Sequence, residues 1–390
     1  MQNRCGGVDA VTERIDSKTE AEQIAGACRN GQALVTSVEK EEKTVSPPKL
    51  YDLTTLQRDA NRLFGFTAKQ TLEYTQSLYE KKMCTYPRTD SQYLSDDMEQ
   101  TAGNVIVAIF SSILFEENRM FNPDIKRMLN SKKVTDHHAI IPTMEIVKAD
   151  LVVLPETERK ILSLVVNRLL CATGEKHLYE TVKAELSCGG YTFAASGKSV
   201  LKNGWKDFED AFKTTEDKEQ EDKKLTELSE GQTFDGVQTK ISEYYTTPPK
   251  HFTEDSLLSA MERAGNEDMS DDVERKGLGT PATRADIIEK LVKDGFVKRE
   301  KKQMIPTEDG MKLITVLPEV VKSPKLTADW ENALALVAKG EMEHEDFMAD
   351  IETMVSDLIH TYHEVSYEQK GCSHKSRRCL VNARTAAEMW

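Results

Sequence analysis

The first third of the chain alternates between strand-like and helix-like spacing of its apolar residues. Apolar and polar residues alternate over Val11–Ile15 and again from Ala33, and a helical pattern covers Thr19–Ala27 between them, so we expect strand, helix and strand. Ser46-Pro-Pro marks a hinge. From Thr54 to Lys82 the apolar residues recur every three or four positions, which predicts helical structure.

The middle of the chain is first helical and then β-rich. Helical spacing covers Met98–Phe115 and Pro155–Ala172, and the second stretch has a continuous apolar face typical of a core helix. Residues 181–200 alternate around Gly189-Gly190, which predicts a β-hairpin. Alternation returns over 233–245.

A second hinge at Thr247-Pro-Pro precedes a mixed segment. Thr253 is placed as the N-cap of a helix that ends before Gly265, and a second helix covers Pro281–Asp294. Phe296–Thr307 is predicted to be a hairpin with a basic tip. Helix followed by basic hairpin resembles a winged helix, and a hairpin that packs only for stability is an equal alternative.

Composition indicates a soluble globular protein of two or three domains. The chain has 390 residues, of which 38% are hydrophobic and 30% charged, and no stretch approaches the length of a membrane span. Seven cysteines without paired spacing indicate a reducing cytoplasm and no metal site. The net charge of −14 argues against a generic nucleic-acid binder, but much of the acid lies in 214–230 and 341–357, which leaves room for a local basic groove.

The segment 85–95, Thr-Tyr-Pro-Arg-Thr-Asp-Ser-Gln-Tyr-Leu-Ser, carries the candidate chemistry. A tyrosine hydroxyl can act as a nucleophile and form a covalent intermediate, and Tyr86 lies two residues before Arg88. An arginine is a permanent forked cation that suits a phosphate undergoing substitution. The pair therefore suggests a tyrosine that attacks a phosphodiester.

Four segments in order make the chain similar to type IA DNA topoisomerases, in their topoisomerase III-like form. They are Leu53–Phe66 (LTTLQRDANRLFGF), Met83–Ser91 (MCTYPRTDS), Asp136–Thr143 (DHHAIIPT) and Lys276–Arg284 (KGLGTPATR). The resemblance implies a multidomain α+β fold in which a helical catalytic domain is inserted into a β-rich domain. We place the β-rich halves at 1–45 and 178–246, the helical domain at 46–177, a DNA-gripping, winged-helix-like domain at 247–365 and an atypical tail at 366–390.

The resemblance implies that Tyr86 cleaves and rejoins one strand of single-stranded DNA through a 5′-phosphotyrosine, without ATP, and so changes DNA topology. Arg88 would stabilise charge on the phosphate oxygens. His137 would contact the phosphate, although which of His137 and His138 acts is open. Tyr93 is a candidate for base stacking or for core packing.

The other expected DNA contacts come from two motifs. On the family interpretation Gln57 and Arg58 face a single-strand groove; otherwise they are ordinary exposed helix residues. The downstream motif would present backbone amides and a helix N-terminus to phosphate, or would be a tight turn that needs glycine. Its expected DNA contacts are Gly277, Gly279, Thr280, Thr283 and Arg284.

The chain also departs from the family. Complete type IA enzymes carry a Toprim domain that holds Mg²⁺, and we find no such segment here. We therefore expect little strand passage from this chain alone, and a separate Toprim-bearing chain is a candidate partner. The basic tail lacks zinc-module spacing, since Cys372 and Cys379 stand alone, and it suggests a fragment of a longer protein or a disrupted gene.

Two other functions compete with a topoisomerase core. One is an inert single-stranded DNA-binding remnant with the same fold. The other is a tyrosine recombinase or relaxase, but a recombinase tyrosine lies near the C-terminus and a relaxase needs a third histidine near His137 and His138.

Overall fold

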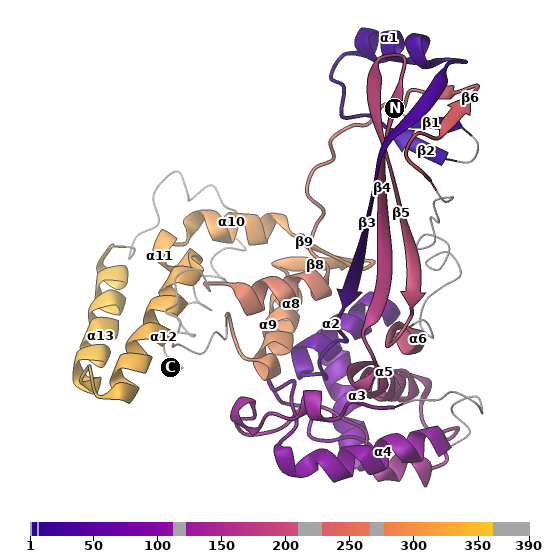
Figure 1. Ribbon diagram of the computed structural model, residues 1–390. Helices are drawn as coiled ribbons and strands as arrows, with labels where there is room; N and C mark the ends of the chain where they lie inside the picture. Colours follow the sequence, from indigo (N-terminus) through magenta and orange to yellow (C-terminus); the bar gives the residue numbers. More distant parts are fainter. Residues whose placement is uncertain (1, 6–7, 112–121, 210–227, 266–276, 362–390) are drawn as a thin grey trace.

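The computed structural model describes residues 2–5, 8–111, 122–209, 228–265 and 277–361. The chain forms a long β-rich arm, a helical body at the base of the arm, and a second, mainly helical body beside it (Figure 1). Among these residues no helix is both long and apolar enough to cross a membrane. The tail at 366–390 and most of the acidic segment at 214–230 lie outside the described residues.

The arm is an antiparallel seven-stranded sheet built from two stretches of chain that flank the helical body. Its strand order is β6-β3-β4-β5-β2-β1-β7. Strands β6 and β7 lie at opposite edges although only Gly236 and Val237 separate them, so the sheet must curl until its edges approach each other. The strands are β1 Gln2–Cys5, β2 Val8–Val11, β3 Gln32–Val45, β4 His177–Cys188, β5 Tyr191–Lys202, β6 Thr233–Asp235 and β7 Gln238–Lys240.

The hairpin predicted around Gly189-Gly190 is confirmed. These two residues connect β4 to β5, and their φ angles of 60° and 83° are ones that glycine adopts readily. A Cβ atom on Gly189 would also lie 2.8 Å from the carbonyl oxygen of Ala27, in helix α1 (Lys18–Cys28). The turn therefore needs glycine for space as well as for conformation.

The strand expected over Val11–Ile15 is wrong in position. Strand β2 instead begins at Val8 and ends at Val11, because Val8 and Ala10 supply the side chains that face the core of the arm. The residues around Ile15 form a coil that leads into α1, and the partly buried Ile15 side chain packs against that core.

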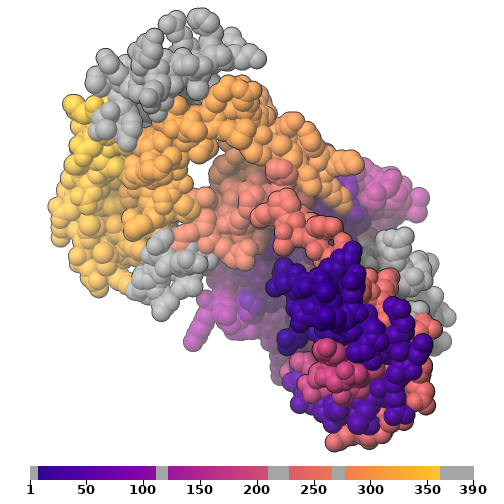
Figure 2. Space-filling model, turned by 90° about the horizontal axis from the view of Figure 1, so that it is seen from above, coloured from indigo at the N-terminus to yellow at the C-terminus, as the bar shows by residue number. Residues whose placement is uncertain are grey.

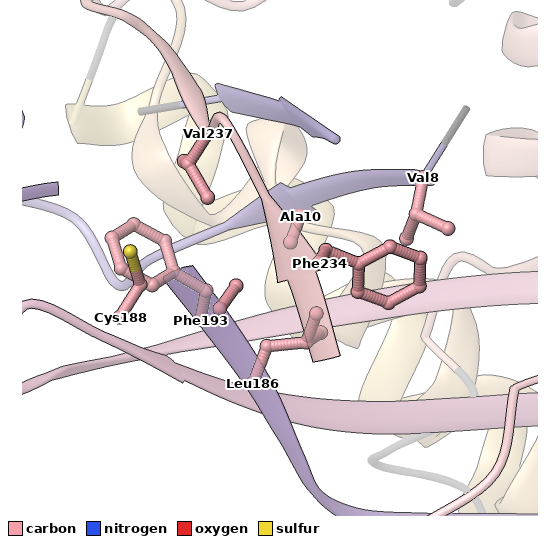
Figure 3. Close-up of a pocket in the computed structure, with 8 residues that line it drawn as sticks. Val8, Ala10, Leu186, Cys188, Phe193, Phe234 and Val237 are labelled. Atoms are coloured by element: carbon pink, nitrogen blue, oxygen red, sulfur yellow. The ribbon is translucent and has the colours of Figure 1, made fainter. Parts of the chain in front are cut away.

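The core of the arm contains a small apolar cavity of about 20 Å³ (Figure 3). A space of this size holds at most one water, which would need polar partners that an apolar lining does not provide. The cavity is therefore a packing defect and not a ligand site. Its lining residues are Val8, Ala10, Ala33, Leu186, Cys188, Phe193, Phe234 and Val237.

The helical body confirms the predicted helices over the described residues, with one break; positions 112–115 of the stretch expected over Met98–Phe115 lie outside them. The helical stretch after Thr54 is two helices, because Gly65 adopts φ of 73° and ends the first, and Thr67 caps the second. Buried side chains such as Leu56, Ile106 and Ile161 join the helices in one core. The helices are α2 Leu53–Phe64, α3 Ala68–Glu80, α4 Glu99–Ser111, α5 Glu156–Thr173 and α6 Lys206–Glu209.

A half-buried ion pair links α2 to α5. The Asp59 carboxylate accepts hydrogen bonds from the Tyr51 hydroxyl, at 2.7 Å, and from the Arg168 guanidinium, which also lies over the Tyr51 ring. Burial raises the pKa of Asp59, but the two partners and Arg62 together lower it below its usual value. The carboxylate therefore stays charged and holds Tyr51 in place.

The second body contains the predicted helix and hairpin of the mixed segment. Thr253 caps α8, as expected, and the hairpin of β8 and β9 follows α9. Helices α8 and α9 pack on α2 and α3, whereas α10 to α13 arch away around an open gap (Figure 2). The elements are α8 Glu254–Arg263, α9 Pro281–Lys293, β8 Val297–Glu300, β9 Gln303–Pro306, α10 Glu308–Val316, α11 Glu319–Lys322, α12 Pro324–Lys339 and α13 His344–Thr361.

We expect Arg168→Met to lower the free energy of unfolding by about 1.5–3 kcal/mol, because the half-buried Asp59 carboxylate loses a charged hydrogen-bond donor and keeps only the more exposed Arg62 as a cation. The double variant Arg168→Met, Asp59→Asn should recover part of this loss, since the half-buried charge is then removed. Urea unfolding followed by circular dichroism measures both. Equal losses in the single and double variants would contradict a charge-based role for Arg168.

Candidate active site around Tyr86

The segment that carries Tyr86 is held by backbone pairing with the histidine motif. Cys84 forms an antiparallel bridge with Pro142. The amide of Thr85 donates to the carbonyl of Ile141 at 2.9 Å, and the Ile141 amide donates back to the Thr85 hydroxyl at 3.0 Å. Two motifs that are about fifty residues apart in sequence therefore lie side by side.

Tyr86 lies between two other rings. Its ring centroid is 4.4 Å from that of His137 and 5.4 Å from that of Tyr79, which meets it edge to face. Tyr86 is half-buried and His137 is exposed, so the pair opens to solvent on one side. The hydroxyl of Thr89 donates to the carbonyl of His137 at 2.7 Å and fixes the backbone of that histidine.

Arg88 and His138 complete the predicted set near Tyr86. Arg88 is exposed on the Tyr86 loop, and its guanidinium forms no ion pair with any of the residues that the structure describes. His138 is half-buried, and its Nδ1 lies 2.8 Å from the carbonyl of Ala139. Because a carbonyl only accepts, this Nδ1 carries the proton and orients the ring. The ring that contacts Tyr86 is that of His137.

Asp52 ties the start of α2 to the Tyr86 loop. Its carboxylate accepts from the Thr55 amide at 2.7 Å, which caps α2, and from the side-chain amide of Gln92 at 3.0 Å. Burial, together with the charge of Glu262, raises the pKa of Asp52 to about 6, although the bonds from Thr55 and Gln92 lower it. Sequence reasoning missed this residue, although an aspartate directly before a helical run is a recognisable N-cap signal.

The position of Gln57 contradicts the expectation that it faces a groove. Gln57 is completely buried, and its side-chain amide donates to the carbonyl of Ala68 at 3.0 Å, which joins α2 to α3. The neighbouring Arg58 is half-buried and forms a 2.7 Å ion pair with Asp255 in α8. Helical spacing placed both residues correctly on α2, but α3 and α8 cover them.

Arg284 is also buried, with only 2% of its surface exposed, so it does not present its guanidinium to solvent. Its Nε donates to the carbonyl of Leu278 at 3.1 Å and its Nη1 to the hydroxyl of Thr54 at 3.0 Å. Burial lowers the pKa of Arg284, and the carboxylates of Glu262 and Asp52 oppose that effect. The residue therefore fastens α9 to the first turn of α2, and the expected DNA contact is corrected.

The glycine motif is a tight turn with an exposed helix start. A Cβ on Gly277 would lie 2.1 Å from the carbonyl of Met261, and Gly279 has φ of 68°, so both positions require glycine. The Thr280 amide is already used, since it donates to the Thr283 hydroxyl at 2.9 Å in a capping arrangement. Both threonine side chains are exposed at the first turn of α9.

The residues that the structure describes include no group of three or more histidine, cysteine, aspartate or glutamate side chains that could hold a metal ion. The Mg²⁺ that the family resemblance implies therefore has no fitting ligand set within this part of the chain.

The fold has a counterpart among solved structures. Full-length topoisomerase I from Thermotoga maritima matches with a TM-score of 0.69, over 91% of this chain and 57% of that chain, at 23% sequence identity. At this identity the likeness defines the fold alone, and the fold class is the multidomain α+β architecture of type IA topoisomerases, as predicted.

Sequence comparison is more specific. A family model described as DNA topoisomerase matches residues 5–349. DNA topoisomerase 3 of Bacillus licheniformis is 38% identical over 349 residues, which are 86% of this chain and 48% of that protein. DNA topoisomerase 3 of Bacillus subtilis is 39% identical over 343 residues, 84% of this chain and 47% of that protein. The chain belongs to the type IA DNA topoisomerase family, and it spans about half the length of these curated relatives.

The raised pKa of Asp52 predicts a pH-dependent contribution to stability. The folded chain binds this proton more tightly than the unfolded chain, so the group favours folding most below about pH 3.9, and the contribution is lost as the pH rises through about 6. Asp52→Asn retains a capping side chain. Between pH 5 and pH 7.5, we expect the free energy of unfolding of Asp52→Asn to rise by about 1–1.5 kcal/mol relative to that of the unmodified chain, as measured by urea unfolding. A pH-independent difference would contradict the role of this carboxyl group.

The buried position of Arg284 predicts an effect on stability. Arg284→Met keeps the length of the side chain but leaves Thr54 and Leu278 without their donor, so we expect a loss of about 2–3 kcal/mol in urea unfolding. Arg263→Met, at an exposed arginine of α8, is the matched control and should change stability by no more than about 0.5 kcal/mol. Similar results for both variants would overturn the assignment.

Proposed function

We propose that this chain is the strand-cleaving core of a type IA topoisomerase and that Tyr86 is its nucleophile. The observation that carries the proposal is the contact between the Tyr86 and His137 rings beside an exposed, unpaired Arg88. A phenol, an imidazole and a guanidinium at one open edge are the groups that phosphoryl transfer needs. The match to proteins named DNA topoisomerase 3 supports the choice of DNA as substrate.

The proposed reaction is a transesterification. The Tyr86 oxygen attacks a phosphodiester of single-stranded DNA, its bond to the 5′ phosphate forms, and the bond to the 3′ oxygen breaks. The phenol proton leaves Tyr86, and the departing 3′ oxygen takes up a proton. Because the new ester conserves the energy of the old one, the 3′ hydroxyl can reverse the reaction and no ATP is required.

Each neighbour of Tyr86 has a proposed role. Arg88 stabilises charge on the non-bridging oxygens, and its fork makes bidentate contact that a lysine cannot reproduce. His137 either holds the phosphate as a cation or accepts the phenol proton when neutral. His138, Thr280 and Thr283 are proposed to bind the DNA strand on either side.

A second candidate function is an inert single-stranded DNA-binding protein with the same fold. It is the alternative because the described residues offer no group of side chains that could hold a metal ion. A separate Toprim-bearing chain in the same cytoplasm would restore activity. The two functions differ in whether Tyr86 ever becomes linked to DNA.

The deciding experiment is trapping on a suicide substrate. The purified chain is mixed with 3′-labelled single-stranded DNA, with and without Mg²⁺, and separated on a denaturing gel. We expect a labelled protein band, because the 5′-phosphotyrosine retains the downstream strand, and we expect Tyr86→Phe to abolish it. Arg88→Lys should reduce the band by at least about tenfold, since one oxyanion contact contributes a factor of 10²–10³ in other enzymes.

The outcomes separate the two functions. A covalent band that Tyr86→Phe removes supports the strand-cleaving core. A shift on a native gel without a covalent band, in both proteins, supports the inert binding protein. A covalent band that survives in Tyr86→Phe would show that Tyr86 is not the nucleophile.

A further inference from the structure

Tyr93 lies close to the nucleophile, on the same loop. The carbonyl of Tyr93 accepts from the amide of Ala139 at 2.9 Å, and Ala139 is two residues from His137, whose ring contacts Tyr86. Two residues span at most about 7 Å of backbone. The backbone of Tyr93 therefore lies beside the segment whose histidine contacts Tyr86.

Two lysines from distant segments converge on the Tyr93 ring. The Nζ of Lys49, in the hinge before α2, is 5.2 Å from the ring centroid, and the Nζ of Lys133 is 5.0 Å from it. Both lysines are exposed and Tyr93 is half-buried. Neither ammonium group forms an ion pair with a carboxylate of the described residues.

The local backbone fixes this arrangement. Ser91 is buried, and its hydroxyl donates to the carbonyl of Lys133 at 2.8 Å while accepting from the amide of Tyr93 at 3.2 Å. The backbones of Tyr93 and Lys133 are therefore held together by the same side chain.

Two cation–π contacts at one ring contribute little to the stability of the fold. An exposed cation–π contact contributes only about 0.5–1 kcal/mol, and two like charges that share one ring repel each other. In a chain with a net charge of −14, carboxylates are abundant, yet the nearby Asp90 and Asp136 form no ion pair with these lysines. An arrangement of this kind is complete only when an anion joins it.

We infer that Lys49, Tyr93 and Lys133 form a binding subsite for single-stranded DNA beside the nucleophile. The two ammonium groups hold backbone phosphates that neighbour the attacked one, and the Tyr93 ring supports an unpaired base. Stacking on an aromatic ring is tolerant of sequence, because every base has a flat face. This inference rests on the proposed function, since it deepens the description of the same DNA-binding site.

The test is DNA-binding affinity as a function of salt concentration. Fluorescence anisotropy with a dye-labelled oligothymidylate gives the slope of log affinity against log salt, and the Tyr86→Phe background removes covalent chemistry from the measurement. Each lost phosphate contact lowers the steepness of this slope by about 0.7 for a single strand. We expect the pair Lys49→Ala, Lys133→Ala to lower it by about 1.4.

The control removes the same charge elsewhere. Lys40 and Lys183 are exposed lysines of the arm, so the pair Lys40→Ala, Lys183→Ala changes the net charge equally and should leave the slope unchanged. At the ring, Tyr93→Phe should bind as before, whereas Tyr93→Leu should bind about 5- to 150-fold more weakly at every salt concentration. Circular dichroism confirms that each variant is folded.

The outcomes distinguish this inference from the proposed function. If the Tyr86→Phe chain binds the oligonucleotide but the two lysine pairs behave alike and Tyr93→Leu binds normally, the subsite is wrong and the proposed function stands. If the chain does not bind single-stranded DNA at any salt concentration, both fail. A reduced slope confined to Lys49 and Lys133 supports the subsite.

Discussion

The backbone pairing between the Tyr86 segment and the histidine motif is the contact on which the candidate site depends. It places the bridge of Cys84 with Pro142 and the two hydrogen bonds between Thr85 and Ile141 directly beside Tyr86. One of these bonds joins two backbone groups and the other uses the Thr85 hydroxyl, so the pairing fixes the position of the loop while the exposed side chains of Arg88 and His137 remain available for chemistry. The contact between Tyr86 and His137 follows from this pairing.

Around that pairing, the charged groups divide into a buried set and an exposed set. Arg284 is buried and Arg168 is half-buried, and both are paired with carboxylate, hydroxyl or carbonyl partners, so they hold α9 and α5 against α2. Arg88, Lys49 and Lys133 are exposed without ion pairs among the described residues. A buried cation must be paired, because leaving it unpaired is costly, whereas an unpaired surface cation is available to a phosphate.

The division between buried and exposed polar groups explains which predicted site residues the structure brings together. Residues on the loops at 85–95 and 136–143 meet around Tyr86, but Gln57 and Arg284 are covered by neighbouring helices. The glycine motif serves the turn before α9, where Gly277 approaches the carbonyl of Met261 too closely for any side chain. Its exposed contribution is limited to the two threonines at the helix start.

The sequence by itself determined the family and the type of most elements, and it singled out the loop at 85–95 as the candidate site. These depend on local signals, such as the spacing of apolar residues, the cap at Thr253 and the glycines at 189 and 190. Only the tertiary structure decided which polar residues face solvent. Helical spacing predicts which face of α2 carries Gln57. Whether α3 or water covers that face depends on contacts between segments that are distant in sequence, and local patterns do not encode those contacts.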